Sequence, residues 1–192
     1  MFKSIKSKVN FAWMEEALLD YWDENLIFEK SVEERSDQNT YFFYDGPPFA
    51  TGLPHYGHLI ASTIKDVVPR YQTMLGKKIE RRFGWDCHGL PVEFEVEKEL
   101  GLNGSADIEA YGVDKFNEKC RSIVLRYANE WKRTIRRLGR WVDMENDYKT
   151  MEVNFMESIW WVFKTLWDKD LIYVSKKIVA FSPRLSTPLS NF

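Results

Sequence analysis

The stretch YFFYDGPPFATGLPHYGHLIASTIKDVV, residues 41–68, decides which fold the chain adopts. It begins with four aromatic residues that are typical of a strand, and it ends in a segment that is suited to a helix. Between the two, prolines and glycines suppress regular structure. They are Gly46, Pro47, Pro48, Gly52, Pro54 and Gly57. The stretch therefore predicts a strand at 41–44, a stiff turn, and a helix over about 56–74 that stops at Gly76.

A second strand is predicted after this helix. KKIERRFGWD (77–86) reads as a short strand that ends at Gly84, and LPVEFEVEKELG (90–101) reads as a short acidic helix. The order of strand, helix and strand is typical of a parallel βαβ unit. The turns at 45–58 and 84–89 then follow neighbouring strands, at the sheet edge where open α/β proteins bind ligands.

The rest of the chain is predicted to be mostly helical. Apolar residues at three- and four-residue steps indicate helices over 11–28, 116–138 and 153–167. The first begins after an N-cap, Asn10. Its expected apolar face is Phe11, Met14, Leu18, Tyr21, Trp22 and Leu26. Residues 31–40 read as a solvated loop, and 171–181 as a strand or hairpin arm.

Length and composition indicate one ordinary globular domain, or one domain with an appendage, in a reducing compartment. The 192 residues are 44% apolar and 29% charged, which is typical of a soluble protein. Two cysteines, Cys87 and Cys120, give no disulfide framework, and no apolar run approaches the length of a membrane span. With a net charge of −2, any nucleic-acid contact has to come from a local patch. We therefore expect a cytoplasmic protein.

Two histidines at the start of the predicted helix form the candidate site. A helix N-terminus attracts anions, and His55 and His58 lie on the same side of its first turn. Gly57 between them has no side chain to block a ligand. In the second turn, Asp86 is a carboxylate that could receive an ammonium group. Together these residues favour binding and polarising a phosphate.

Other interpretations of the same residues stay open at this stage. His55, His58, Cys87 and His88 could form a tetrahedral metal site, although adjacent Cys and His rarely reach one ion without strain. Asp86 could instead cap the following helix. A basic cluster could contact nucleic-acid phosphates, but an ion-paired helix flank is favoured. That cluster is Lys132, Arg133, Arg136, Arg137 and Arg140.

GPPFATGLPHYGH (46–58), followed by GWDCHGLPVE (84–93), closely resembles the class I aminoacyl-tRNA synthetases. Within them, the match is to the isoleucyl-tRNA synthetases of the eukaryotic cytosolic type. HxGH alone is shared by many nucleotidyltransferases, whereas its combination with the second motif is much more specific. The resemblance covers the whole chain, from NFAWMEEALLDYW (10–22) to TPLSNF (187–192).

The resemblance implies an α/β fold. The chain is expected to be the N-terminal half of a Rossmann-like, parallel-sheet catalytic domain, with an N-terminal helix and a helical second half. Residues 1–40 are then a helical extension, 41–182 the first half of the catalytic domain, and 183–192 the start of an editing insertion. The family's second signature loop, rich in Lys and Ser, is absent, so we expect a truncated part that is inactive alone.

The resemblance also implies a reaction and its residues. Isoleucine attacks the α-phosphate of ATP, and the resulting adenylate acylates tRNA(Ile) through the full-length enzyme. His55 and His58 are the expected catalytic residues, and Mg²⁺ is expected to accompany ATP. The residues expected to bind ATP are Pro48, Gly52, His55, Gly57 and His58. Those expected to bind isoleucine are Gly46, Pro47 and Asp86.

One departure from the family pattern concerns zinc. The family often has Pro-Tyr-Cys-Pro-Arg-Cys where this chain reads AFSPRLSTPL (180–189). Ser182 and Leu185 occupy the positions of the zinc-binding cysteines, and neither replaces a thiolate well. We therefore expect no zinc. The alternative functions are a small, complete HxGH nucleotidyltransferase and a non-catalytic binding module.

Overall fold

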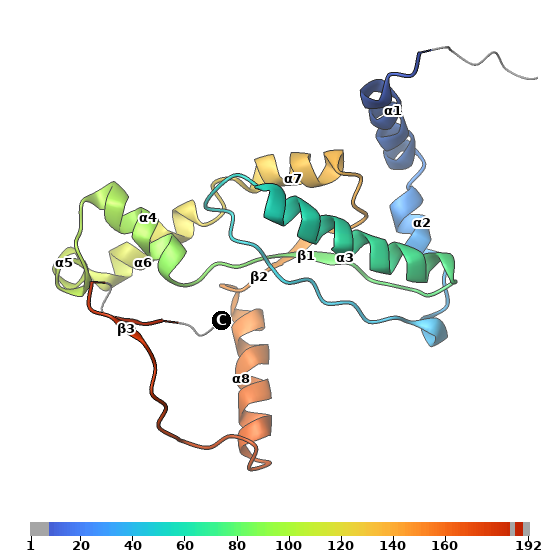
Figure 1. Ribbon diagram of the computed structural model, residues 1–192. Helices are drawn as coiled ribbons and strands as arrows, with labels where there is room; N and C mark the ends of the chain where they lie inside the picture. The colour runs from blue at the N-terminus through green and yellow to red at the C-terminus, as the bar shows by residue number, and fades with distance from the viewer. Residues whose placement is uncertain (1–7, 185–186, 190–192) are drawn as a thin grey trace, which may run out of the picture. The chain divides into compact units, whose positions relative to one another are not determined.

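Figure 1 shows the computed structural model of the chain, which describes residues 8–184 and 187–189. The chain divides into two compact units, Met1–Glu152 and Val153–Phe192. The first unit contains the parallel strands and the helices around them. Within the described residues, no helix is both long and apolar enough to span a membrane.

Parallel pairing organises the first unit, as predicted, but its regular ladder includes a strand, residues 143–149, that was not predicted. Strand β1 (Arg82–Trp85) pairs in parallel with β2 (Asp143–Lys149). An extended segment, residues 40–49, runs parallel to residues 78–86 and bonds to them at its two ends. The prediction of a regular strand at 41–44 is wrong. Residues 41–48 are not assigned to a strand, and the segment pairs with residues 78–86 through isolated bridges at Thr40 and Phe49.

Helix α3 (Tyr56–Met74) joins the extended segment to β1 and has the predicted bounds. It ends before Gly76, whose φ of 82° is a left-handed conformation that glycine adopts at little cost. In Figure 1, α3 and α7 (Ala128–Arg137) are drawn on the same side of β1 and β2. Helix α3 begins a few residues after the extended segment ends at Phe49, as the predicted turn requires.

The predicted N-terminal helix is divided. Helix α1 (Phe11–Glu24) begins after Asn10, whose side chain accepts a hydrogen bond from Trp13 N–H at 3.2 Å, so this N-cap is confirmed. Leu26 has a φ of 51° and ends the run, and α2 (Ile27–Glu33) follows. A single helix over 11–28 was therefore wrong. The prediction of a loop throughout 31–40 was also wrong, because this range includes the end of α2 and a short 3-10 helix, η1 (Asp37–Asn39).

The buried face of α1 also differs from the prediction. Leu19 is the buried residue of this helix, and it was not one of the expected positions. Most of the expected face is exposed: Phe11, Met14, Leu18, Tyr21 and Leu26. The spacing of apolar residues predicted a helix here. Which face of α1 is buried depends on contacts with residues far along the chain, such as those of α7.

The second half of the unit has more breaks than predicted. Helices α4 (Leu90–Leu100), α5 (Ser105–Tyr111) and α6 (Val113–Ile123) precede α7. The predicted helix 116–138 is interrupted at residues 124–127, where Tyr127 N–H donates to the carbonyl of Ala50 at 3.2 Å. The interruption brings this segment against Ala50, within the turn at 45–58.

One hydrophobic core lies beneath that turn. Trp85 and Trp131 are its largest side chains, each 1% exposed, and Ala50 is fully buried within it. The remaining buried members are Phe83, Cys87, Val92, Val96, Phe116, Ile123, Val124 and Ile135. Burial of this apolar surface stabilises the core against which the turn packs through Ala50.

The second unit begins with α8 (Val153–Trp167), as predicted. No side chain of α8 is buried. Residues 171–181 were predicted to form a strand or hairpin arm, but residues 171–180 are not assigned to a strand. Instead β3 (Phe181–Ser182) pairs antiparallel with β4 (Thr187–Pro188). Ser182 lies in β3, and Leu185 lies outside the described residues.

Candidate active site

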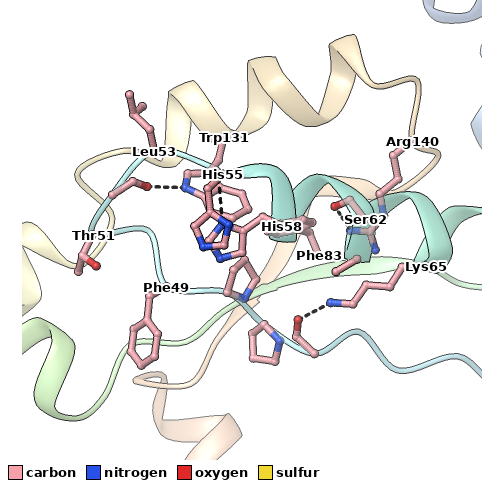
Figure 2. Close-up of a pocket in the computed structure, with 15 residues that line it drawn as sticks. Phe49, Thr51, Leu53, His55, His58, Ser62, Lys65, Phe83, Trp131 and Arg140 are labelled. Carbon is pink, nitrogen blue, oxygen red and sulfur yellow. Dashed lines mark hydrogen bonds between the residues drawn. The ribbon is translucent and has the colours of Figure 1, made fainter.

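A pocket of about 450 Å³ opens beside the start of α3 (Figure 2). This volume is within the usual range for small-molecule sites. Its walls come from the turn, from the first three turns of α3, and from single side chains of β1, α7 and the loop after α7. The lining residues are Gly46, Pro47, Pro48, Phe49, Thr51, Gly52, Leu53, His55, His58, Ala61, Ser62, Lys65, Phe83, Trp131 and Arg140.

The two histidines cap the helix that carries them. His55 is the N-cap of α3, and its Nδ1 accepts a hydrogen bond from Gly57 N–H at 3.1 Å. His58 Nδ1 accepts from the backbone N–H of His55 at 3.2 Å. The rings stack with centroids 3.7 Å apart. Because each Nδ1 is an acceptor, the neutral rings carry their proton on Nε2 and present it as a donor.

Gly57 leaves room for this arrangement. A Cβ at position 57 would lie 3.0 Å from Cε1 of His55, which is tighter than ordinary contact. The residue does not line the pocket, so its observed role is to leave room for the capping ring of His55. Its expected role in ATP binding stays a prediction.

Trp131 of α7 supports the pair from behind. The centroid of its ring lies 4.8 Å from that of the His58 ring, and its Nε1–H donates to the carbonyl of Gly52 at 2.8 Å. One buried side chain therefore contacts the helix start and also fixes the turn. The sequence pattern identified Trp131 only as an apolar position, although a buried tryptophan needs a partner for its N–H.

A buried ionic group closes the other end of the pocket. Asp45 pairs with Arg140 at 2.5 Å and with Lys65 at 2.7 Å, and its own side chain is only 1% exposed. Arg140 also donates to Ser62 Oγ at 3.2 Å. Neither Asp45 nor Lys65 was singled out in the sequence, and Arg140 was counted only as part of a basic cluster.

Burial lowers the pKa of His58 below its ordinary value of 6.5, and electrostatic interaction with His55 and Lys65 lowers the pKa further. His58 is therefore neutral near pH 7, which keeps Nδ1 free to accept its backbone hydrogen bond. The unfolded chain binds this proton more readily, so the contribution of His58 to stability is present above pH 6.5 and lost as the pH falls through the folded-state pKa.

We expect an NMR titration of the imidazole Cε1–H signals to give His58 a pKa below 6.5. Lys65→Met removes one of the causes and should raise the pKa of His58. Lys132→Met is the matched control, because Lys132 pairs with Glu145 at 3.0 Å, outside this pocket, and should leave the pKa unchanged. A pKa of His58 above 6.5 in the unmodified chain would contradict this picture.

Most of the expected ligand-binding residues meet in the pocket, but Asp86 does not line it. Asp86 follows β1, and its backbone N–H donates to the carbonyl of Pro48 at 2.9 Å, which places it next to the turn. The alternative that Asp86 caps α4 is wrong, since the N-cap is Gly89 and no side chain caps that helix. Binding of an ammonium group by Asp86 stays a prediction.

The alternative of a metal site formed by His55, His58, Cys87 and His88 is not supported by the structure. Cys87 and His88 line a separate pocket of about 230 Å³, away from His55 and His58. Across residues 8–184 and 187–189, no three His, Cys, Asp or Glu side chains are close enough to hold an ion.

Ion pairs account for most of the basic cluster, as the favoured interpretation predicted. Arg136 pairs with Asp20 at 3.0 Å and with Asp23 at 2.6 Å, both on α1. Arg137 pairs with Glu15 at 2.8 Å. Lys132 pairs with Glu145, and Arg140 belongs to the pocket. The pairs of Lys132, Arg136 and Arg137 therefore join α7 to α1 and β2.

A family model for the class I tRNA synthetases of the I, L, M and V group matches residues 17–192. The chain belongs to this family. It is 63% identical over its full length to an isoleucine–tRNA ligase of Treponema denticola and 58% identical to that of Protochlamydia amoebophila. It covers only 17% and 18% of these relatives, respectively. Both come from bacteria, so they give no support to the eukaryotic cytosolic subtype.

The fold agrees with that of a solved class I synthetase. A crystal structure of LeuRS from Agrobacterium radiobacter, in a ternary complex with tRNA and LeuAMS, matches 91% of the chain with a TM-score of 0.57. The sequences are 23% identical, and the chain covers 20% of that protein. The predicted α/β, synthetase-like fold is thus confirmed. The finer division into 1–40, 41–182 and 183–192 stays a prediction.

Proposed function

We propose that the chain forms the first half of the active site of an isoleucine–tRNA ligase, which activates isoleucine with ATP and transfers it to tRNA(Ile). One observation carries the proposal. The two imidazoles at the start of α3 are fixed by their own backbone so that both Nε2–H groups are donors. The identity to isoleucine–tRNA ligases over the whole chain supports the choice of amino acid.

The reaction fits a site of this kind. An isoleucine carboxylate oxygen attacks the α-phosphorus of ATP, the bond to the bridging oxygen breaks, and pyrophosphate leaves. Charge grows on the phosphate oxygens, and the donors of His55 and His58 stabilise it without rearranging, because capping has already oriented the rings. Pro48, Gly52 and Gly57 are the further residues proposed for ATP. No covalent bond to the protein forms.

Isoleucine and Mg²⁺ are assigned as follows. Gly46, Pro47 and Asp86 are proposed to bind isoleucine, with the carboxylate of Asp86 receiving its ammonium group. The described residues offer no ready cluster of side-chain ligands, so we propose that Mg²⁺ is held mainly by the phosphates of ATP, as is usual for this ion. The proposed function places the protein in the cytoplasm.

We expect the purified chain to bind ATP weakly and not to charge tRNA(Ile), because it spans only 17–18% of the related ligases. His55→Asn retains an N-cap side chain but lacks the ring donor, so it should weaken ATP binding about tenfold. His58→Ala should have a similar effect. His88→Ala is the control, because His88 lines another pocket, and it should bind ATP normally.

Heteronuclear NMR titration with ATP measures these affinities. Equal binding by the His55→Asn, His58→Ala and His88→Ala variants would contradict the role of the paired histidines. Sustained charging of tRNA(Ile) by the 192-residue chain would contradict its assignment as half a site. Adenylate formation from a phosphorylated small substrate, with no response to isoleucine, would favour the complete nucleotidyltransferase instead.

A further inference from the structure

The turn that lines the pocket is stiff within itself but needs to be attached to the helix beside it. Pro47 and Pro48 restrict its backbone angles, yet proline has no N–H and cannot donate a hydrogen bond. Relative placement of the turn and α3 therefore depends on other groups. At residues 45–46, the structure provides such an attachment from the middle of α3.

Lys65 makes that attachment. Its ammonium group donates to the carbonyl of Gly46 at 2.6 Å and pairs with the carboxylate of Asp45 at 2.7 Å (Figure 2). Lys65 lies seven residues after His58, which is about two helical turns, so both project from the same face of α3 and line the same pocket. One helix face thus holds the histidines at one end and the turn at the other.

The partner of Lys65 is itself firmly placed. Asp45 is held by Arg140, with both side chains almost fully buried, and Arg140 also bonds to Ser62 of α3. The hydroxyl of Tyr148 on β2 donates to the backbone carbonyl of Asp45 at 2.6 Å. Lys65 is the more accessible cation of this group, with a side chain 29% exposed.

We propose that Lys65 is a positioning residue for residues 45–49, the first part of the turn. It sets the distance between the backbone of Gly46 and Pro47 and the paired histidines of α3. It acts through the turn and contacts no reacting atom. Only the identity of the ligand rests on the proposed function. The attachment itself follows from the two contacts of the ammonium group.

The two cations of the group have separable roles. Without Lys65, Asp45 still has its buried partner Arg140, so the fold should survive. What is lost is the bond to Gly46 and the second contact of Asp45, and the turn should then sample other positions. If the correct position falls to about a tenth of the molecules, the apparent dissociation constant of a ligand that needs it rises about tenfold.

The test compares Lys65→Met and Lys65→Arg in the 192-residue chain. The probe is a non-hydrolysable sulfamoyl analogue of isoleucyl-adenylate, titrated by NMR. Lys65→Met should weaken its binding about tenfold and broaden or split the amide signals of Gly46 and Phe49. Lys65→Arg can still reach both acceptors and should restore both signals and bring the affinity to within about twofold.

Lys132→Met is the control for loss of a lysine ion pair. Lys132 has a similarly exposed side chain, at 33%, but its partner Glu145 is 85% exposed and lies away from the turn. It should change neither the affinity nor the amide signals. Unchanged Gly46 and Phe49 signals in Lys65→Met would overturn the proposal. So would shifts spread evenly to core residues such as Val96, because general destabilisation produces that pattern.

Failure of the proposed function gives a different result. If the unmodified chain does not bind the analogue, the assignment of the ligand fails. The Gly46 and Phe49 signals of Lys65→Met and Lys65→Arg still decide the positioning role, since they need no ligand.

Discussion

Asp45→Asn should lower the free energy of unfolding of the chain by about 3–5 kcal/mol, the usual cost of removing one partner of a buried ion pair. The substitution keeps the shape of the side chain and removes its charge. Arg140, whose side chain is 2% exposed, then keeps a buried positive charge without its carboxylate partner. Lys65 adds repulsion, because the two cations now face each other without the anion between them.

Urea denaturation followed by tryptophan fluorescence measures this loss. Glu145→Gln is the control, since it removes the carboxylate of the Lys132 pair, which is 85% exposed. Exposed pairs contribute little, so this variant should stay within about 1 kcal/mol of the original. A loss in Asp45→Asn no larger than that of Glu145→Gln would show that the buried group does not hold the turn.

The elements that sequence patterns predicted are those that local interactions determine. Helix α3 begins and ends as expected because its start is marked by a proline-rich turn and its end by Gly76. The N-cap at Asn10 was equally local. In each case a few neighbouring residues carry the whole signal.

Breaks and strands that depend on distant partners were missed. Strand β2 reads DMENDYK, which shows no apolar alternation, and it pairs with β1 about sixty residues earlier in the chain. The interruption at 124–127 is accompanied by a backbone bond from Tyr127 to Ala50. Apolar periodicity continues through both 25–26 and 124–127, so it predicts one helix in each place where the structure has two.

The candidate site shows the same contrast. His55 and His58 were found because they lie three residues apart beside a recognisable turn. The network behind them joins residues far apart in sequence: Arg140 comes 95 residues after Asp45, and Trp131 comes 79 residues after Gly52. No pattern within one segment connects such residues. A buried charge or a buried indole N–H reveals its partner only when the chain is folded.

Gly84→Ala should cost about 3 kcal/mol of stability, at the upper end of the range for overpacking a well-packed site. Gly84 pairs with Tyr148 across β1 and β2. A Cβ on Gly84 would fall on the ring atoms Cζ and Cε1 of Tyr148, far inside contact distance. The ring cannot simply turn away, because its hydroxyl holds the carbonyl of Asp45 at 2.6 Å.

A double-mutant cycle with Tyr148→Ala separates this clash from any general effect of alanine in β1. Without the ring, Gly84→Ala should cost less than about 1 kcal/mol, which gives a coupling of about 2 kcal/mol. Gly52→Ala is the matched control, because no heavy atom lies within 4 Å of its added Cβ. Equal costs of Gly84→Ala in both backgrounds would contradict the clash.

The consequence of Gly84→Ala should extend to the site. Moving the ring of Tyr148 releases the carbonyl of Asp45, and Asp45 is the residue through which Lys65 and Arg140 hold the turn. The variant should therefore broaden the amide signals of Gly46 and Phe49 as Lys65→Met does, whereas Gly52→Ala should leave the signal of Gly46 sharp. A glycine in the sheet then affects the pocket, because Tyr148 packs against Gly84 and also holds Asp45, the partner of the pocket residues Lys65 and Arg140.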